Sequence, residues 1–142
     1  MISFQSQSLS FRLKGQKNFK AWLQSIAEKE KKEIAELSYV FMSDAELLEH
    51  NIKYLNHTSL TDIITFDYCE GKSIKGDILI SIERVKENAA TFDVGFEVEL
   101  KRVMAHGLLH LCGYKDKKKS DIEIMRKKEN AALKLWQQLY AE

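Results

Sequence analysis

Proline is absent from this 142-residue chain, and the only cysteines are Cys69 and Cys112. Without proline the chain has no rigid proline-rich linker, and two cysteines cannot form a disulfide framework, so we expect a reducing, cytoplasmic compartment. Long apolar runs are also missing, as none approaches the ~18 residues of a transmembrane helix. The first residues lack a basic start and an apolar stretch, so we expect neither a signal peptide nor a membrane partner.

Net charge is almost absent as well. The 22 Lys and Arg residues nearly balance the 21 Asp and Glu residues, which leaves +1 at pH 7. This balance excludes a protein that binds nucleic acid through bulk charge, although a local basic patch stays open. Hydrophobic residues make up 44% and charged residues 30% of the chain, as in ordinary globular proteins. The length then predicts a single domain over residues 1–142.

The apolar periodicity predicts strands and helices in alternation. The predicted strands are 1–11, 37–43, 61–68 and 75–81, and the predicted helices are 15–33, 43–55, 81–91, 97–112 and a last helix from Ser120. Ser43 with Glu46, and Ser120 with Glu123, have the spacing of capping boxes. A turn signal at residues 70–73 predicts a hairpin of the last two strands. The order predicts a small α/β (α+β) domain, with a mixed four-stranded sheet packed with about five helices.

Two histidines of the predicted helix 97–112 are candidate metal ligands. His106 and His110 are four residues apart, so their rings leave one helix face a turn apart and can bind one tetrahedral metal ion. Gly113 ends the helix, and Asp116 can return after the reversal as a third ligand. Three protein ligands leave a position for water, which is typical of a catalytic zinc site. The alternative is two ordinary histidines on a helix face.

The same segment is similar to the zinc-peptidase motif H-E-x-x-H-x-x-G-x-x-H, with two changes. Gly107 stands where the peptidases have Glu, and Asp116 stands where they have the third His. The peptidase Glu is the general base, and glycine cannot take up a proton. The sequence therefore disfavours peptide hydrolysis by that route.

Three segments resemble motifs of the YbeY-type endoribonucleases, the bacterial ribosomal RNA maturation factors. Residues His106–Tyr114 match H-G-x-L-H-L-x-G-Y at every fixed position. Thr61–Phe66 and Gly76–Ser81 match the strand motifs T-D-V-L-S-F and G-D-I-x-I-S, while Asn51 and Tyr54 fit N-x-x-Y. The motifs occur in the family's order and spacing.

This resemblance covers about residues 37–140 and implies a compact α/β domain with the metal on the long central helix. It implies a zinc-dependent, single-strand-specific endoribonuclease that acts in maturation of small-subunit ribosomal RNA and in ribosome quality control. One zinc ion per chain would be held by His106, His110 and Asp116. The implied partners are single-stranded regions of ribosomal RNA and the small subunit or ribosome-associated proteins.

Two positions depart from the family pattern. The third ligand is usually His and here is Asp116, and the residue after the Tyr of N-x-x-Y is usually Arg and here is Leu55. In the family that Arg is associated with phosphate binding or catalysis, and Leu55 cannot bind phosphate. His57, Lys53 and Lys115 are nearby candidates to replace it. His57 is also the only side chain that we consider as a catalytic group beside metal-bound water.

Basic residues beside Asp116 predict where RNA would bind. Lys115, Lys117, Lys118 and Lys119 lie next to Asp116, and Lys53 is a further candidate. Arg126, Lys127 and Lys128 follow on the last helix, and together with the lysines beside Asp116 they can form a local basic footprint. The alternative is a solvated loop. The missing Arg keeps two other functions open: a ribosome-associated assembly factor with a structural or vestigial metal site, and a metal-dependent hydrolase of another substrate.

Overall fold

One four-stranded sheet and five helices make up the part of the chain that the structure describes. The computed structural model describes residues 1–7, 10–55 and 60–140. The elements in chain order are β1 (Ile2–Ser6), α1 (Gln16–Lys29), β2 (Glu33–Met42), α2 (Asp44–Leu55), β3 (Ile63–Asp67), β4 (Ser73–Ser81), α3 (Ile82–Thr91), α4 (Phe96–Leu111) and α5 (Lys119–Tyr140). The predicted fold class is confirmed.

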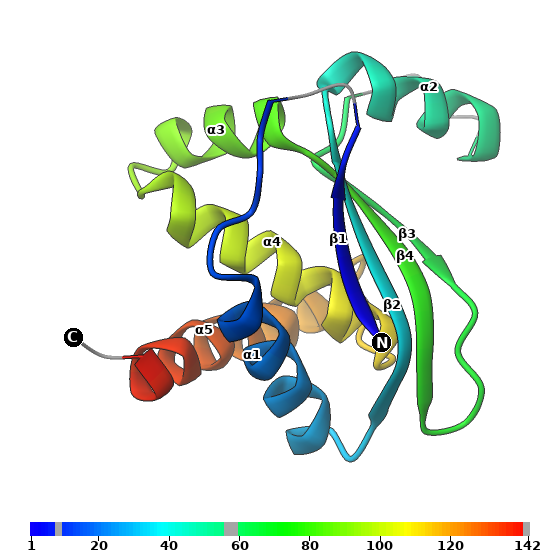
Figure 1. The fold of residues 1–142 in the computed structure, drawn as a ribbon, viewed down its shortest axis with the longest axis vertical. Coiled ribbons are helices and arrows are strands. Elements are labelled where there is room, and N and C mark those ends of the chain that lie inside the picture. Colours follow the sequence, from blue (N-terminus) through cyan, green and yellow to red (C-terminus); the bar gives the residue numbers. More distant parts are fainter. Residues whose placement is uncertain (8–9, 56–59, 141–142) are drawn as a thin grey trace.

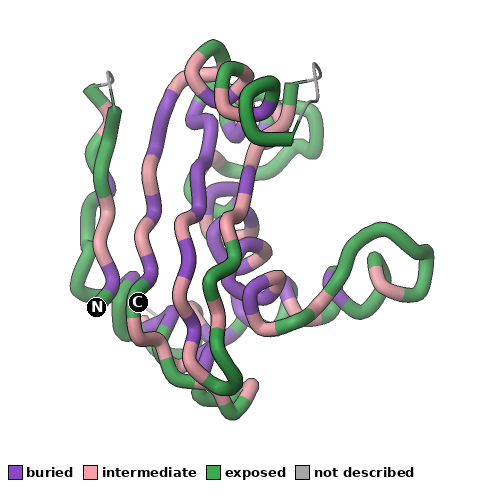
Figure 2. Tube along the Cα trace, turned by 90° about the vertical axis from the view of Figure 1, so that its right-hand side faces the viewer, coloured by how far each residue is buried: buried purple, intermediate pink, exposed green. Residues whose placement is uncertain are grey.

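The sheet is mixed, with the strand order β1-β2-β4-β3. Strands β1, β2 and β4 are parallel, whereas β3 pairs antiparallel with β4, which confirms the predicted hairpin. Helices α1, α4 and α5 lie on one face of the sheet (Figure 1). The other face, which we call the outer face, is covered at one end by α2, the one helix among the described residues that packs there (Figure 2). Strand β3 is an edge strand, because it ends the strand order, and groups on either face of the sheet can be reached around it.

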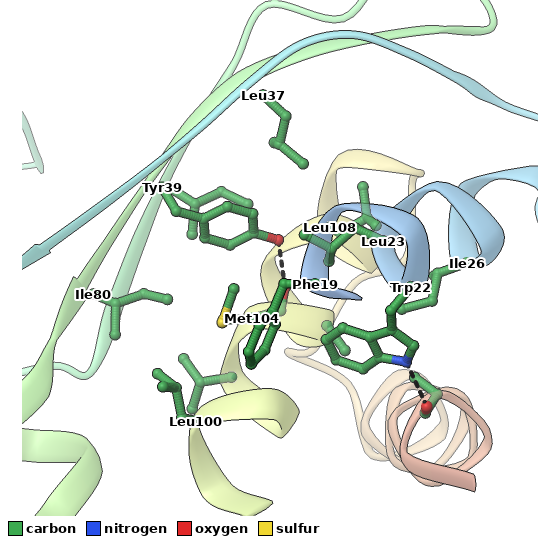
Figure 3. Close-up of a cluster of buried hydrophobic side chains, with 14 of the residues drawn as sticks. Phe19, Trp22, Leu23, Ile26, Leu37, Tyr39, Ile80, Leu100, Met104 and Leu108 are labelled. Carbon is green, nitrogen blue, oxygen red and sulfur yellow. Dashed lines mark hydrogen bonds between the residues drawn. The ribbon is translucent and has the colours of Figure 1, made fainter. Parts of the chain in front are cut away.

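The main core lies between the sheet and the helices (Figure 3). Alternate residues of β2 point into it, and Leu37, Tyr39 and Phe41 are each at most 1% exposed. The Tyr39 hydroxyl donates a hydrogen bond to the carbonyl oxygen of Met104 at 2.8 Å, which joins the sheet to α4. Trp22 Nε1 donates to the carbonyl oxygen of Ala132 at 2.8 Å, which joins α1 to α5. Both of these buried polar groups thus have a hydrogen-bond partner.

A smaller core on the outer face holds α2. It consists of Met42, Leu47, Ile64 and Leu79. The predicted capping box at the start of α2 is confirmed, because the backbone N–H of Glu46 donates to Ser43 Oγ and that of Ser43 donates to Glu46 Oε1, each at 3.2 Å. No helix in the described part of the chain is long and apolar enough to span a membrane.

The second predicted capping box is wrong. Helix α5 begins at Lys119, so Ser120 lies inside its first turn. The reason is a hydrogen bond from the backbone N–H of Ile122 to the carbonyl oxygen of Lys118 at 2.9 Å, which starts the helix before Ser120. A serine within the turn cannot accept the hydrogen bonds that define a cap.

Candidate metal centre and adjoining pocket

The end of α4 brings His106 and Asp116 together. Gly113 has a φ of +111°, a conformation that favours glycine, and the chain reverses there. The reversal is closed by hydrogen bonds from the backbone N–H groups of Gly113 and Tyr114 to the carbonyls of His110 and Leu109, at 3.0 and 3.1 Å. Asp116 returns alongside α4, and its Oδ2 lies 3.1 Å from His106 Nε2.

His110 lies one helical turn further along and makes a different contact. Its Nδ1 lies 3.1 Å from the carbonyl oxygen of Tyr114. A ring that donates from Nδ1 keeps the Nε2 lone pair as its acceptor or metal ligand. Within residues 1–7, 10–55 and 60–140, no three His, Cys, Asp or Glu side chains converge closely enough to hold a metal ion. The structure thus joins two of the three expected ligands.

Glu129 on α5 is a member of the site that sequence reasoning missed. Its Oε2 lies 2.8 Å from His106 Nδ1, and the residue is only 5% exposed. The other carboxylate oxygen, Oε1, accepts from Arg102 at 3.2 Å. The sequence carries one signal for it, because Glu129 falls between Met125 and Ala132 on the apolar face of α5. A carboxylate in such a position needs a buried partner.

The three expected donor groups fit a zinc ion in kind, and two of them, His106 and Asp116, also fit it in spacing. Two ligands at ~2.0–2.1 Å from a tetrahedral ion lie ~3.3 Å apart, close to the 3.1 Å that separates His106 Nε2 from Asp116 Oδ2. Both histidines also direct Nδ1 to a protein acceptor, Glu129 for His106 and the Tyr114 carbonyl for His110. Zinc-binding histidines have this arrangement, because the second contact sets the tautomer and ring orientation.

A pocket of about 420 Å³ opens beside His106 and Asp116, and we call it the site pocket. Its walls are formed by Thr61 and Asp62 just before β3, by the first residue of β3, and by α3, α4 and α5. The charged residues that line it are Asp62, Glu99, Arg102, Asp116, Arg126 and Glu129. Arg102 is engaged by Glu129 and Asn130, whereas the Arg126 side chain is 58% exposed. Arg126 is therefore the more available cation at this pocket.

Among the expected basic residues, Arg126 lines the site pocket and the lysines do not. Lys53, Lys115, Lys117 and Lys118 are exposed, and the site pocket is lined by two arginines instead of by them. Lys53 Nζ lies 5.2 Å from the centre of the Tyr54 ring on α2. His57 lies outside the described residues.

Burial and neighbouring charges shift the pKa values of three groups in the site pocket. Burial lowers the pKa of His106, but the hydrogen bond and charge of Glu129 and the charge of Asp116 outweigh it and raise the pKa above its ordinary value. Burial raises the pKa of Asp62, and His106 partly offsets this. Burial also raises the pKa of Glu99, against the effect of Arg102. The negative groups around His106 favour a positive charge at that position.

Comparisons with known proteins agree over nearly the whole chain. A family model described as Endoribonuclease YbeY matches residues 1–137. The Endoribonuclease YbeY of Flavobacterium psychrophilum is 52% identical over 136 residues, which cover 96% of each chain. That of Flavobacterium johnsoniae is 48% identical over 136 residues, which cover 96% of this chain and 97% of the relative. The solution structure of TM1509 from Thermotoga maritima is 29% identical with a TM-score of 0.66, over 97% of this chain and 93% of that one.

Proposed function

The chain belongs to the YbeY endoribonuclease family, and we propose that it is a metal-dependent endoribonuclease that cleaves single-stranded RNA in the maturation of small-subunit ribosomal RNA. The contact of His106 with Asp116 at the site pocket is the observation that carries the proposal. We further propose a cytoplasmic single-domain enzyme that works at the small subunit and in ribosome quality control.

His106, His110 and Asp116 are the proposed ligands of one zinc ion. When bound, the ion would supply positive charge to a phosphodiester and to the nucleophile that attacks it. The remaining roles belong to the chain itself. Glu129 holds the ring of His106 through Nδ1, and the Tyr114 carbonyl holds that of His110. Such contacts fix ligand geometry before a metal arrives.

Arg126 is our proposal for the cation that receives the RNA phosphate. Leu55 occupies the position of the family's Arg, so another positive group is needed beside the pocket. Arg126 lines the site pocket, and its ion pair with Glu129 is long, at 3.9 Å. A guanidinium with free N–H groups can bind a phosphate through two hydrogen bonds.

Cleavage of a single-stranded RNA by parent and His110→Ala protein tests the proposed function. We expect the parent to cleave, chelation to abolish cleavage, and added zinc to restore it. The variant His110→Ala should be at least about 100-fold slower, since loss of a ligand removes the charge that catalysis needs. Cys112→Ala, two residues further along, controls for disturbance of the helix end. Equal cleavage by the His110→Ala protein, as a contaminating nuclease would give, contradicts the proposal.

A ribosome-associated assembly factor is the second candidate function. Leu55 favours it, because this 46% exposed apolar side chain at the position of the family's Arg cannot bind phosphate. This candidate predicts a protein that binds zinc and small-subunit RNA without cleaving it. Binding and cleavage measured on the same RNA distinguish the two functions.

A further inference from the structure

A second concavity lies on the outer face of the sheet, away from the metal centre. It measures about 370 Å³ and lies between α2 and the strands β2, β3 and β4. We call it the outer groove. Aromatic rings dominate one side of it: His50 and Tyr54 from α2, Phe66 from β3, and Tyr68 just after β3. A groove with flat rings at its rim suits a flat ligand.

Two rings of the outer groove are exposed, and ring contacts hold one of them, Tyr54, in a fixed orientation. Tyr54 is 52% exposed and Tyr68 is 57% exposed. The His50 ring stacks on Tyr54, with centroids 5.7 Å apart and an interplanar angle of 15°. Phe66 meets Tyr54 edge-on at 5.5 Å. The exposed Tyr68 ring and the already oriented pair of Tyr54 and His50 can extend their stack to a base at small entropic cost, which is how proteins hold single-stranded RNA.

Polar groups beside the rings match the rest of a nucleotide. Asp77 of β4 lines the groove, and no hydrogen bond or ion pair joins its carboxylate to another residue in the described part of the chain. A free carboxylate can accept hydrogen bonds from the amino group of a base. The ammonium group of Lys53 lies 5.2 Å from the Tyr54 ring centre, where it can face a phosphate. A groove with aromatic rings, a carboxylate acceptor and a nearby ammonium group fits an RNA nucleotide better than it fits an apolar peptide.

The edge strand β3 connects the outer groove to the site pocket. Ile63 lines the site pocket, and Phe66 lines the outer groove. Three residues of a strand span about 10 Å, a distance that a short stretch of RNA can cross. We propose that the outer groove is a base-binding subsite: it stacks a base of the same single-stranded RNA whose phosphodiester lies in the site pocket. This inference rests on the proposed function.

Affinity for a short single-stranded RNA tests the subsite. The RNA carries 2′-O-methyl sugars and phosphorothioate linkages so that it resists cleavage, and fluorescence anisotropy measures binding. We expect Tyr54→Ala and Tyr68→Ala to weaken binding about tenfold, and Tyr54→Phe to bind as the parent does, because a phenyl ring also stacks. Ile52→Ala is the matched control, since Ile52 is an exposed apolar residue of the same helix that does not line the groove.

Two further readouts separate the subsite from a structural role. With cleavable RNA, Tyr54→Ala should raise KM and leave kcat unchanged, because the base is remote from the reacting phosphate. A set of RNAs is made in which each RNA lacks the base at one position. The parent should bind one member of the set more weakly than the others, because that member lacks the stacked base. The Tyr54→Ala protein should bind all members of the set equally. Unchanged RNA affinity in both alanine variants, as expected of a protein-docking surface, overturns the subsite alone. A parent that binds no RNA overturns the proposed function and the subsite together.

Discussion

At the scale of single residues, His106 is the centre of the site. Its two ring nitrogens face carboxylates from two different segments, Asp116 at 3.1 Å and Glu129 at 2.8 Å. The motif around α4 predicts His106, His110 and Asp116 as a group, since all three lie within one short segment. Glu129 could not be assigned in this way, because its partner is fixed only when α5 packs on α4. Local spacing therefore finds ligands more readily than it finds the groups that orient them.

Replacement of Glu129 by Gln tests whether it orients His106. We expect Glu129→Gln to lower zinc affinity by about 10- to 100-fold, as loss of a group behind a metal-binding histidine commonly does. Competition with a chromogenic chelator measures this affinity without any reference to cleavage. Glu123→Gln is the control, because Glu123 is exposed on the same helix. Equal zinc affinity in both variants contradicts the role of Glu129.

At the scale of elements, the close approach of α4 to the sheet explains a glycine inside the motif. A Cβ atom at Gly107 would lie 2.9 Å from Ile78 Cδ1 and 3.0 Å from Ile63 Cδ1. Position 107 therefore faces the sheet, and a glutamate there would be driven into β3 and β4. The sequence predicts that peptide hydrolysis is disfavoured because glycine is no base, and the packing adds that a larger residue does not fit.

Gly107→Ala should destabilise the fold, although alanine forms helices more readily than glycine does. Helix propensity alone favours alanine by ~1 kcal/mol. Overpacking of a core costs about 1–3 kcal/mol, because neighbouring side chains must move. We expect the cost of overpacking to exceed the gain in helix propensity, with a net loss of about 1 kcal/mol in the free energy of unfolding. Urea unfolding measures it, and a gain in stability would show that α4 is not held against the sheet at this point.

Element boundaries show what periodicity predicts and where it fails. All four strands and five helices were predictable, because each has an apolar pattern of its own. β2 begins at Glu33 instead of residue 37, since pairing with β4 extends it to the Glu33–Ser73 pair. The strand order β1-β2-β4-β3 could not be derived, because it depends on where the helical connections cross the sheet. The start of α5 shifted for a similar reason, as hydrogen bonding overrode the capping signal at Ser120.

At the scale of the whole molecule, a nearly neutral chain concentrates charge in one pocket. The formal net charge is +1, yet the site pocket gathers several carboxylates around His106 and leaves Arg126 exposed at its rim. The composition excluded binding through bulk charge, and the structure agrees by placing charge locally. The sequence predicted Arg126 as part of the basic footprint, whereas the place of Arg102 could not be predicted, because α4 and α5 meet at this pocket only in the folded chain.

Stability at alkaline pH gives a prediction for the fold as a whole. Burial raises the pKa of the Cys112 thiol from 9.0 to about 11. Above pH 9 the unfolded chain therefore loses this proton while the folded chain keeps it, so the unfolded state is favoured as pH rises. The contribution of Cys112 is full below pH 9 and is lost as pH rises through about 11.

Cys112→Ala should consequently lose less stability than the parent between pH 9.0 and about 11, which are the pKa values of the thiol in the unfolded and the folded chain. Urea unfolding at several pH values measures the slope for both proteins. Burial raises the pKa of Tyr39 as well, and this effect of burial is common to both proteins. The charge of Cys112 raises the pKa of Tyr39 further in the parent alone, so that part belongs to the difference that Cys112 makes. Identical slopes would show that the thiol is not buried as described.

The zinc content of the purified protein tests the central claim most directly. The parent, Asp116→Ala and the control Glu123→Ala are supplied with zinc, freed of excess ion and measured by elemental analysis. We expect about one zinc ion per chain in the parent and in the control, and far less in Asp116→Ala, because a three-ligand site loses a ligand. No zinc in the parent, or equal zinc in all three proteins, would contradict a metal centre at His106, His110 and Asp116.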